Sequence, residues 1–185
     1  LYMKCPICKE VLSTHTLLES RLSAYRCPKC EGIWISSNEY LRWLKTQGST
    51  LPEKTGDDAN IPTGDTPQMK LCPACGHFLT RYRVLPRVRF YLDRCGSCNG
   101  VWFDKNKWEV LVSRNLHDKV NQFFTQPWQS KIRDEEARET LEKLYLEKFG
   151  AEDYARVKEI WAWLSQNPRR TMLLAYLQSN NPYKI

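Results

Sequence analysis

The sequence predicts a small metal-bound α+β protein that ends in an α-helical region. Three observations lead to this fold class. All eight cysteines fall in Cys-x-x-Cys pairs, the pairs form two copies of one unit, and from residue 119 onward the pattern is helical. We divide the chain into a first repeat (1–45), a flexible linker (46–68), a second repeat (69–118) and a helical region (119–185). Each repeat is expected to hold a β-hairpin and a short helix.

The cysteine pairs supply two sets of four sulfur ligands. The first set is Cys5, Cys8, Cys27 and Cys30, and the second is Cys72, Cys75, Cys95 and Cys98. Four thiolates at this paired spacing are the tetrahedral ligand set of a structural Zn²⁺. We therefore expect two Zn²⁺, one in each set. A Cys₄ set also suits a single iron, which leaves a rubredoxin-like electron carrier open.

Two other interpretations of the cysteines are less favoured. Disulfides need an oxidising compartment, but the chain opens Leu1-Tyr2-Met3 with no apolar run that resembles a signal peptide. A thioredoxin-like motif would be one pair near a βαβ pattern, whereas these pairs come in twos. The cysteine usage therefore predicts a reducing compartment, the cytoplasm or an organelle stroma, and no secretion.

The duplication extends beyond the metal ligands. Cys27 and Cys95 stand 68 residues apart, as do Trp34 and Trp102, and each tryptophan ends a Gly-x-Trp motif. Such self-similarity indicates a duplicated mini-domain. Because a domain of this size has few large side chains to bury, both tryptophans are expected in the core, covering the metal site.

These motifs resemble the TFIIB-type zinc-ribbon domains, whose pattern is Cys-Pro-x-Cys, a short hairpin, then Cys-Pro-x-Cys-x-Gly-x-Trp-Leu-Asp-x-x-Glu. The likeness covers about residues 3–45 and 70–113. The first repeat has Ser36 where the pattern has Asp, and the second has Gly96 for the proline and Lys107 for the glutamate. The resemblance implies two tandem zinc ribbons and is specific for the fold, while it says little about function.

A helix should follow the tryptophan in each repeat. Ser36 and Glu39 have the spacing of a capping box, which predicts a well-capped helix in the first repeat. In the second repeat Asp104 is the expected cap. Lys107 would place a positive charge near the helix N-terminus, where the macrodipole disfavours it, so this helix should begin weakly. The linker is rich in turn-forming residues, which predicts a solvated spacer. We expect the two repeats to move independently unless a partner or the C-terminal region clamps them.

Three helices are predicted in the C-terminal region. They run from about Arg133 to Phe149, from about Glu152 to Gln166, and from near Arg169 toward Asn180. Their apolar stripes are expected to pack into a mutual core, and Trp163, at the edge of its stripe, is a candidate partner contact. No stretch reaches the length of a membrane span. Peripheral membrane contact through the basic start of the third helix and its apolar face stays open.

Charge is concentrated in the second repeat. The formal net charge is +7, and two zinc-bound Cys₄ sites, each of charge −2, lower it to +3. Residues 69–118 nevertheless carry nine Lys and Arg against four Asp and Glu. The sequence predicts strands at 81–84 and 87–91 whose basic side chains share one face suited to phosphates, with Tyr91 placed to stack on a base. The same face would equally suit an acidic protein surface or anionic lipid head groups. The candidate binding residues are Arg81, Arg83, Arg87, Arg89 and Tyr91.

Enzymatic function finds little support in the sequence. If all eight cysteines bind metal, no thiol nucleophile remains, and a closed Cys₄ site offers no position for an activated water. We expect a non-enzymatic adaptor or assembly factor that docks onto a larger protein complex. The alternative is a transcription-related nucleic-acid binder that uses the basic hairpin, and the iron electron carrier is the third.

Overall fold

The structure is a computed structural model that describes residues 2–12, 14–18, 21–47, 61–86 and 88–183. The chain divides into two compact units, Leu1–Asp134 and Glu135–Ile185. The first unit combines an antiparallel sheet with two clusters of four cysteines, and helices make up the second. The predicted fold class, a small metal-bound α+β protein with a helical C-terminal region, is confirmed.

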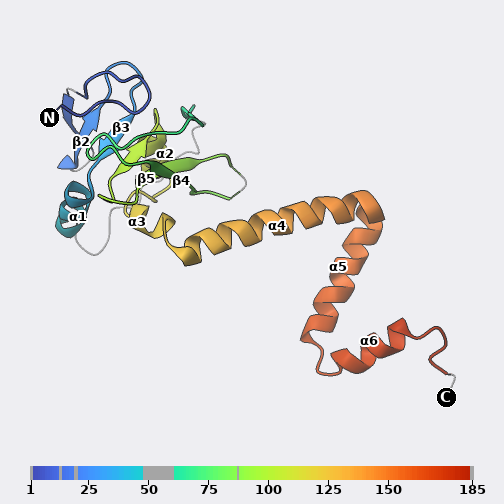
Figure 1. Ribbon diagram of the computed structural model, residues 1–185. Coiled ribbons are helices and arrows are strands. Elements are labelled where there is room, and N and C mark those ends of the chain that lie inside the picture. Colours follow the sequence, from blue (N-terminus) through green and yellow to red (C-terminus); the bar gives the residue numbers. More distant parts are fainter. Residues whose placement is uncertain (1, 13, 19–20, 48–60, 87, 184–185) are drawn as a thin grey trace. The chain divides into compact units, whose positions relative to one another are not determined.

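One six-stranded antiparallel sheet runs through the first unit (Figure 1). The strands are β1 (Thr14–Leu17), β2 (Ser23–Arg26), β3 (Ile33–Ile35), β4 (Leu79–Arg83), β5 (Tyr91–Cys95) and β6 (Val101–Phe103). Their order is β1-β2-β3-β6-β5-β4, so the last strand of the first repeat pairs with the last strand of the second. At this central pairing Trp34 lies opposite Trp102.

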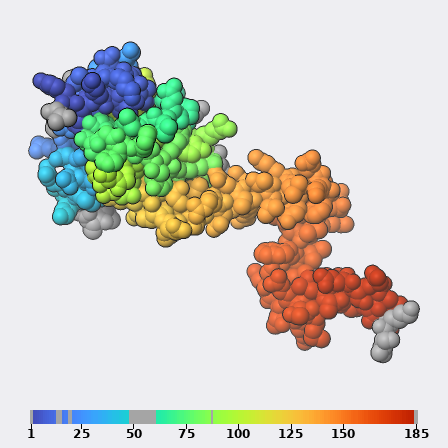
Figure 2. Space-filling view, viewed as in Figure 1, coloured from blue at the N-terminus to red at the C-terminus, as the bar shows by residue number. Residues whose placement is uncertain are grey.

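The two repeats contribute strands to one sheet, contrary to the expectation that they would move independently. Every residue of β3 and β6 is buried, and these short strands consist of Ile, Val, Trp and Phe. A separate repeat would leave such a strand as an exposed apolar edge, whereas pairing the two edges buries both and completes their backbone hydrogen bonds. The first repeat (blue) and the second repeat (green) accordingly form one continuous body in Figure 2.

The helices that follow the two tryptophan strands begin differently. In α1 (Ser37–Thr46), Ser36 is the N-cap and its hydroxyl accepts from the Glu39 N–H at 3.3 Å, as predicted. In α2 (Lys107–Ser113), the predicted cap at Asp104 is wrong. Asn106 occupies the N-cap position with a φ of 62° and makes no side-chain capping bond. The Asp104 carboxylate instead accepts from the Trp102 indole N–H at 2.9 Å, so it is unavailable to the helix.

Residues 119–134 pack with the repeats rather than with the helical region to which the predicted boundary at 118 assigned them. They include α3 (Val120–Phe123) and the start of α4 (Gln126–Phe149). The buried side chains in this segment are Val120, Phe123, Phe124 and Ile132. Trp128 also donates from its indole to the carbonyl of Val84 at 3.1 Å. Apolar contacts and hydrogen bonds together therefore hold the segment to the first unit.

The C-terminal helices match the predicted ones in number and nearly in extent. They are α4, α5 (Ala151–Gln166) and α6 (Arg170–Gln178). The first begins at Gln126, ahead of the predicted Arg133, because Pro127 lies in the first turn, where a missing N–H costs no helical hydrogen bond. Gly150 separates α4 from α5 at a φ of 77°, a conformation that favours glycine.

The mutual core expected of these helices does not form. Among the described residues 135–183, Leu164 alone is buried. Trp163 is 55% exposed, and Trp161 in the same helix is 64% exposed. Within the described part of the chain, no helix has the length and apolar character needed to cross a membrane.

Candidate metal centres

The structure brings each predicted cysteine set together. Within each set the four sulfur atoms lie within 4.8 Å of one another. The Sγ–Sγ distances include 3.5 Å for Cys5–Cys30 and for Cys72–Cys98, and 3.4 Å for Cys75–Cys95. Four sulfurs at about 2.3 Å from a tetrahedral zinc stand about 3.8 Å apart, whereas a disulfide bond is about 2.05 Å. The eight free thiols therefore fit two metal ions and not disulfides.

Each Cys-x-x-Cys pair is held by the same tight turn. The residue after the second cysteine has a positive φ at all four turns: Lys9, Glu31, Gly76 and Asn99. Its N–H donates to the carbonyl of the first cysteine at 2.9–3.0 Å. The turn also points backbone N–H groups at sulfur, as where Cys8 donates to Cys5 Sγ at 3.3 Å. Such donors stabilise the thiolate form that binds metal.

Each set combines thiols whose pKa is raised with one whose pKa is lowered. Burial raises the pKa of Cys5 to about 11. Cys75 is exposed, and a hydrogen bond from the His77 backbone lowers its pKa to about 6. Because only thiolates bind zinc, the ion must displace protons from the buried sulfurs.

Comparison with protein-family models decides what these centres are. Residues 4–46 and 71–114 match the family model of the TFIIB zinc ribbon, described as transcription factor zinc-finger. The chain carries two tandem TFIIB-type zinc ribbons. Each ribbon has one Cys₄ site for a zinc ion, as predicted. Comparison with curated proteins and with solved structures finds no match.

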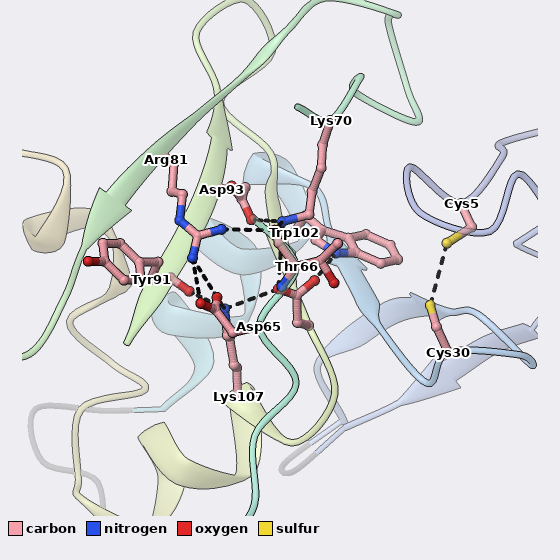
Figure 3. Close-up of polar contacts among 11 residues, drawn as sticks. Cys5, Cys30, Asp65, Thr66, Lys70, Arg81, Tyr91, Asp93, Trp102 and Lys107 are labelled. Carbon is pink, nitrogen blue, oxygen red and sulfur yellow. Dashed lines mark hydrogen bonds and ion pairs between the residues drawn. The ribbon is translucent and has the colours of Figure 1, made fainter. Parts of the chain in front are cut away.

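A buried network of charged side chains supports the second ribbon (Figure 3). The amine of Lys70 donates to Asp93 Oδ2 at 2.6 Å and to the Thr66 carbonyl at 2.7 Å. Lys70 and Asp93 are 1% and 5% exposed. Burial nevertheless raises the pKa of Asp93, with Lys70 opposing that shift. A fully desolvated pair of this kind depends on both partners, since either one alone would be an uncompensated buried charge.

Lys107 belongs to the same network. Its amine donates to Asp104 Oδ2 at 3.1 Å, to Asp65 Oδ1 at 3.0 Å and to the Tyr91 carbonyl at 2.7 Å. The expected clash with the helix macrodipole is thus offset by two carboxylates. Sequence reasoning missed Lys70, Asp65 and Asp93, because nothing local marks them. The signal available in the sequence was Lys107, which stands three residues after Asp104, where the zinc-ribbon pattern has a glutamate.

The end of the linker is bound to the second ribbon, which differs from the solvated spacer predicted there. The Gly64 N–H donates to the Lys105 carbonyl at 3.0 Å, and the Thr66 N–H donates to Asp104 Oδ2 at 3.1 Å. Asp65 accepts two hydrogen bonds from Arg81, at 2.6 and 2.7 Å. Residues 48–60 of the linker lie outside the described residues.

The predicted basic hairpin is only partly brought together. Arg81 is occupied by Asp65, and its guanidinium lies 4.3 Å from the centroid of the Tyr91 ring, covering the face expected to stack on a base (Figure 3). Arg83 donates from Nε to the Leu85 carbonyl at 3.3 Å. Arg89 is exposed, and Arg87 lies outside the described residues.

The predicted second strand of this hairpin begins later than expected. β5 starts at Tyr91, which pairs with Arg83, so the described residues 84–86 and 88–90 belong to neither strand. Val84, Leu85 and Phe90 among these residues are buried. Their burial in the core differs from the alternating strand predicted for this part of the hairpin.

Proposed function

We propose that this protein is a non-enzymatic adaptor or assembly factor that works in a reducing compartment. In this proposal the two zinc ribbons form a rigid base and the helical unit, residues 135–185, docks onto a larger protein complex. The exposed apolar surface of that unit carries the proposal.

Most large apolar side chains among the described residues of the helical unit are exposed. Its exposed large side chains are Leu141, Leu144, Tyr145, Leu146, Phe149, Val157, Ile160, Trp161, Trp163, Met172, Tyr176, Leu177 and Tyr183. Scattered exposed leucines are ordinary, but a concentration of aromatic and aliphatic side chains marks a surface that is covered in use. Tryptophan and tyrosine are also the residues most enriched at the centres of protein interfaces.

Charge favours a protein partner for this unit. Residues 135–185 hold eight Lys and Arg and eight Asp and Glu, so they carry no net charge to attract nucleic acid or anionic lipid. Association would therefore depend on burial of apolar area, which is the main driving force of protein–protein binding.

The test uses the full chain with substitutions on the exposed face of α5. Replacing both Ile160 and Trp161 by Gln is expected to abolish capture of the partner complex while zinc content stays at two per chain. The matched control replaces Arg156 and Glu159 in the same helix by Gln and should retain capture. Equal capture by both variants, or loss in both, would contradict docking through the apolar face.

A nucleic-acid binder is the second candidate, and the charge of the first unit favours it. Residues 1–134 carry 20 Lys and Arg against 13 Asp and Glu, and two zinc sites reduce this excess from +7 to +3. Binding through the hairpin loop predicts that Arg89→Ala weakens affinity and flattens its salt dependence. Arg81→Ala should act on stability instead, because Arg81 is already paired with Asp65. If the protein does not bind nucleic acid, or binds it with an affinity that does not change with salt concentration, this role is excluded.

A further inference from the structure

The two ribbons contact each other through a reciprocal pair of tryptophans and glycines. A Cβ atom added to Gly32 would lie 2.2 Å from Cζ2 of Trp102, and one added to Gly100 would lie 2.2 Å from Cζ2 of Trp34. Each indole therefore rests directly on the glycine backbone of the other ribbon. No side chain fits at either glycine without moving the ring, which explains why both ribbons have Gly-x-Trp.

These glycines belong to the turns that hold the metal ligands. The Gly32 carbonyl accepts from the Cys27 N–H at 2.8 Å, and the Gly100 carbonyl accepts from the Cys95 N–H at 2.9 Å. Cys27 and Cys95 are ligands of the first and second sites. Each ring thus covers the backbone segment that positions two ligands of the opposite site.

Both metal centres also share one apolar cluster. Its buried members are Cys5, Leu12, Cys27, Trp34, Cys72, Leu79, Cys95 and Trp102. Trp34 and Trp102 are 1% and 0% exposed and face each other across the β3–β6 pair. Disorder at one Cys₄ site would therefore open the cluster that packs against the other.

We propose that the Trp34–Gly100 and Trp102–Gly32 contacts couple the two zinc sites, so that an ion in one site raises the affinity of the other. An ion in the second site would hold the turn that ends at Gly100 in the conformation on which Trp34 packs. Trp34 lies on β3, which follows the ligand turn of the first site, so this contact would stabilise the first site as well. Coupling of this kind is reciprocal, since each site must change the affinity of the other by the same factor.

The first test uses the unmodified protein and Zn²⁺ alone. Native mass spectrometry during graded removal of zinc by a chelator counts chains with two, one or no ions. Coupled sites predict that the one-zinc species stays well below the level expected for two independent sites. A one-zinc species at or above that statistical level would overturn the proposal.

Ligand variants measure the size of the coupling. Cys8→Ala disables the first site, and competition with a chromophoric chelator then reports zinc affinity at the second. We expect affinity about 10–100-fold weaker than in the unmodified protein, the usual effect of losing structural support around a metal site. Cys75→Ala should weaken the first site by a similar factor. Unchanged affinity at the intact site in both variants would contradict the proposal.

A glycine variant tests the contact while all eight cysteines remain. Gly100→Ala forces the Trp34 ring away and should increase the one-zinc species during chelation. Gly96→Ala is the matched control, because a Cβ there has no atom within 4 Å and its φ lies outside the left-handed region. Gly96→Ala should release zinc as the unmodified protein does. Equal behaviour of the two variants would show that the contact does not couple the sites.

Discussion

The backbone N–H of Val120 donates a hydrogen bond of 3.1 Å to the hydroxyl of Tyr40, eighty residues earlier in the chain. The same hydroxyl donates to the carbonyl of His117 at 2.8 Å. One side chain on α1 of the first ribbon therefore satisfies two backbone groups in the segment that follows the second ribbon. This link ties the start of that segment to the first ribbon.

Tyr40→Phe should destabilise the first unit by about 1–3 kcal/mol, because it leaves a buried donor and a buried acceptor without partners. The ring should still pack on Trp43, whose centroid lies 5.6 Å away. Urea unfolding followed by tryptophan fluorescence measures the change. Tyr82→Phe is the control: its ring packs edge-on against Phe124, and we expect a change below about 0.5 kcal/mol. Equal losses in the two variants would contradict the role of the Tyr40 hydroxyl.

Lys70→Met should cost about 3–5 kcal/mol at neutral pH, because it leaves Asp93 buried without its cation. Lys29→Met is the control, since the pair of Lys29 with Glu10 is exposed and 3.9 Å long. Burial raises the pKa of Asp93 in the folded protein, so protonation favours folding. The free energy of unfolding lost in Lys70→Met should therefore become smaller as the pH falls and the Asp93 carboxyl gains its proton. Denaturant unfolding at two pH values tests both points, and a pH-independent deficit would argue against a charged Asp93.

Asp65→Asn should lower stability at neutral pH and have less effect in acid. Burial alone would raise the pKa of Asp65, but hydrogen bonds and charge from Lys107 and Arg81 outweigh it and lower the pKa below its ordinary value. A carboxyl of this kind contributes stability above its unfolded pKa and loses that contribution as the pH falls through its folded pKa. The difference between the unmodified protein and Asp65→Asn, about 1.5–3 kcal/mol at neutral pH, should therefore begin to shrink below about pH 4 and be lost as the pH falls through the lowered pKa of the folded protein. A difference that grows on acidification would refute this assignment.

Protein purified without added metal should contain two zinc atoms per chain and be colourless. Atomic absorption gives the metal content. The visible spectrum distinguishes zinc from iron, because of these two metals only iron has sulfur-to-metal charge-transfer bands in the visible range. Zinc removal should disrupt both ligand turns and the apolar cluster that the two metal centres share, because the free energy of binding a structural zinc ion is part of the folding free energy. Iron in either site, with its visible bands, would instead support the electron carrier.

The sequence by itself determined the local chemistry: the two Cys₄ sets, the duplication, the Ser36 cap and the three C-terminal helices. These features depend on residue type and spacing within a short window, where turn, cap and helix preferences act. The tertiary structure alone decided how the repeats combine. The pairing of β3 with β6, the packing of Trp34 on Gly100 and of Trp102 on Gly32, and the burial of Lys70 and Lys107 join residues up to 70 positions apart. Such contacts form because apolar strand edges and buried charges must find partners, and which partners they find depends on the assembled sheet.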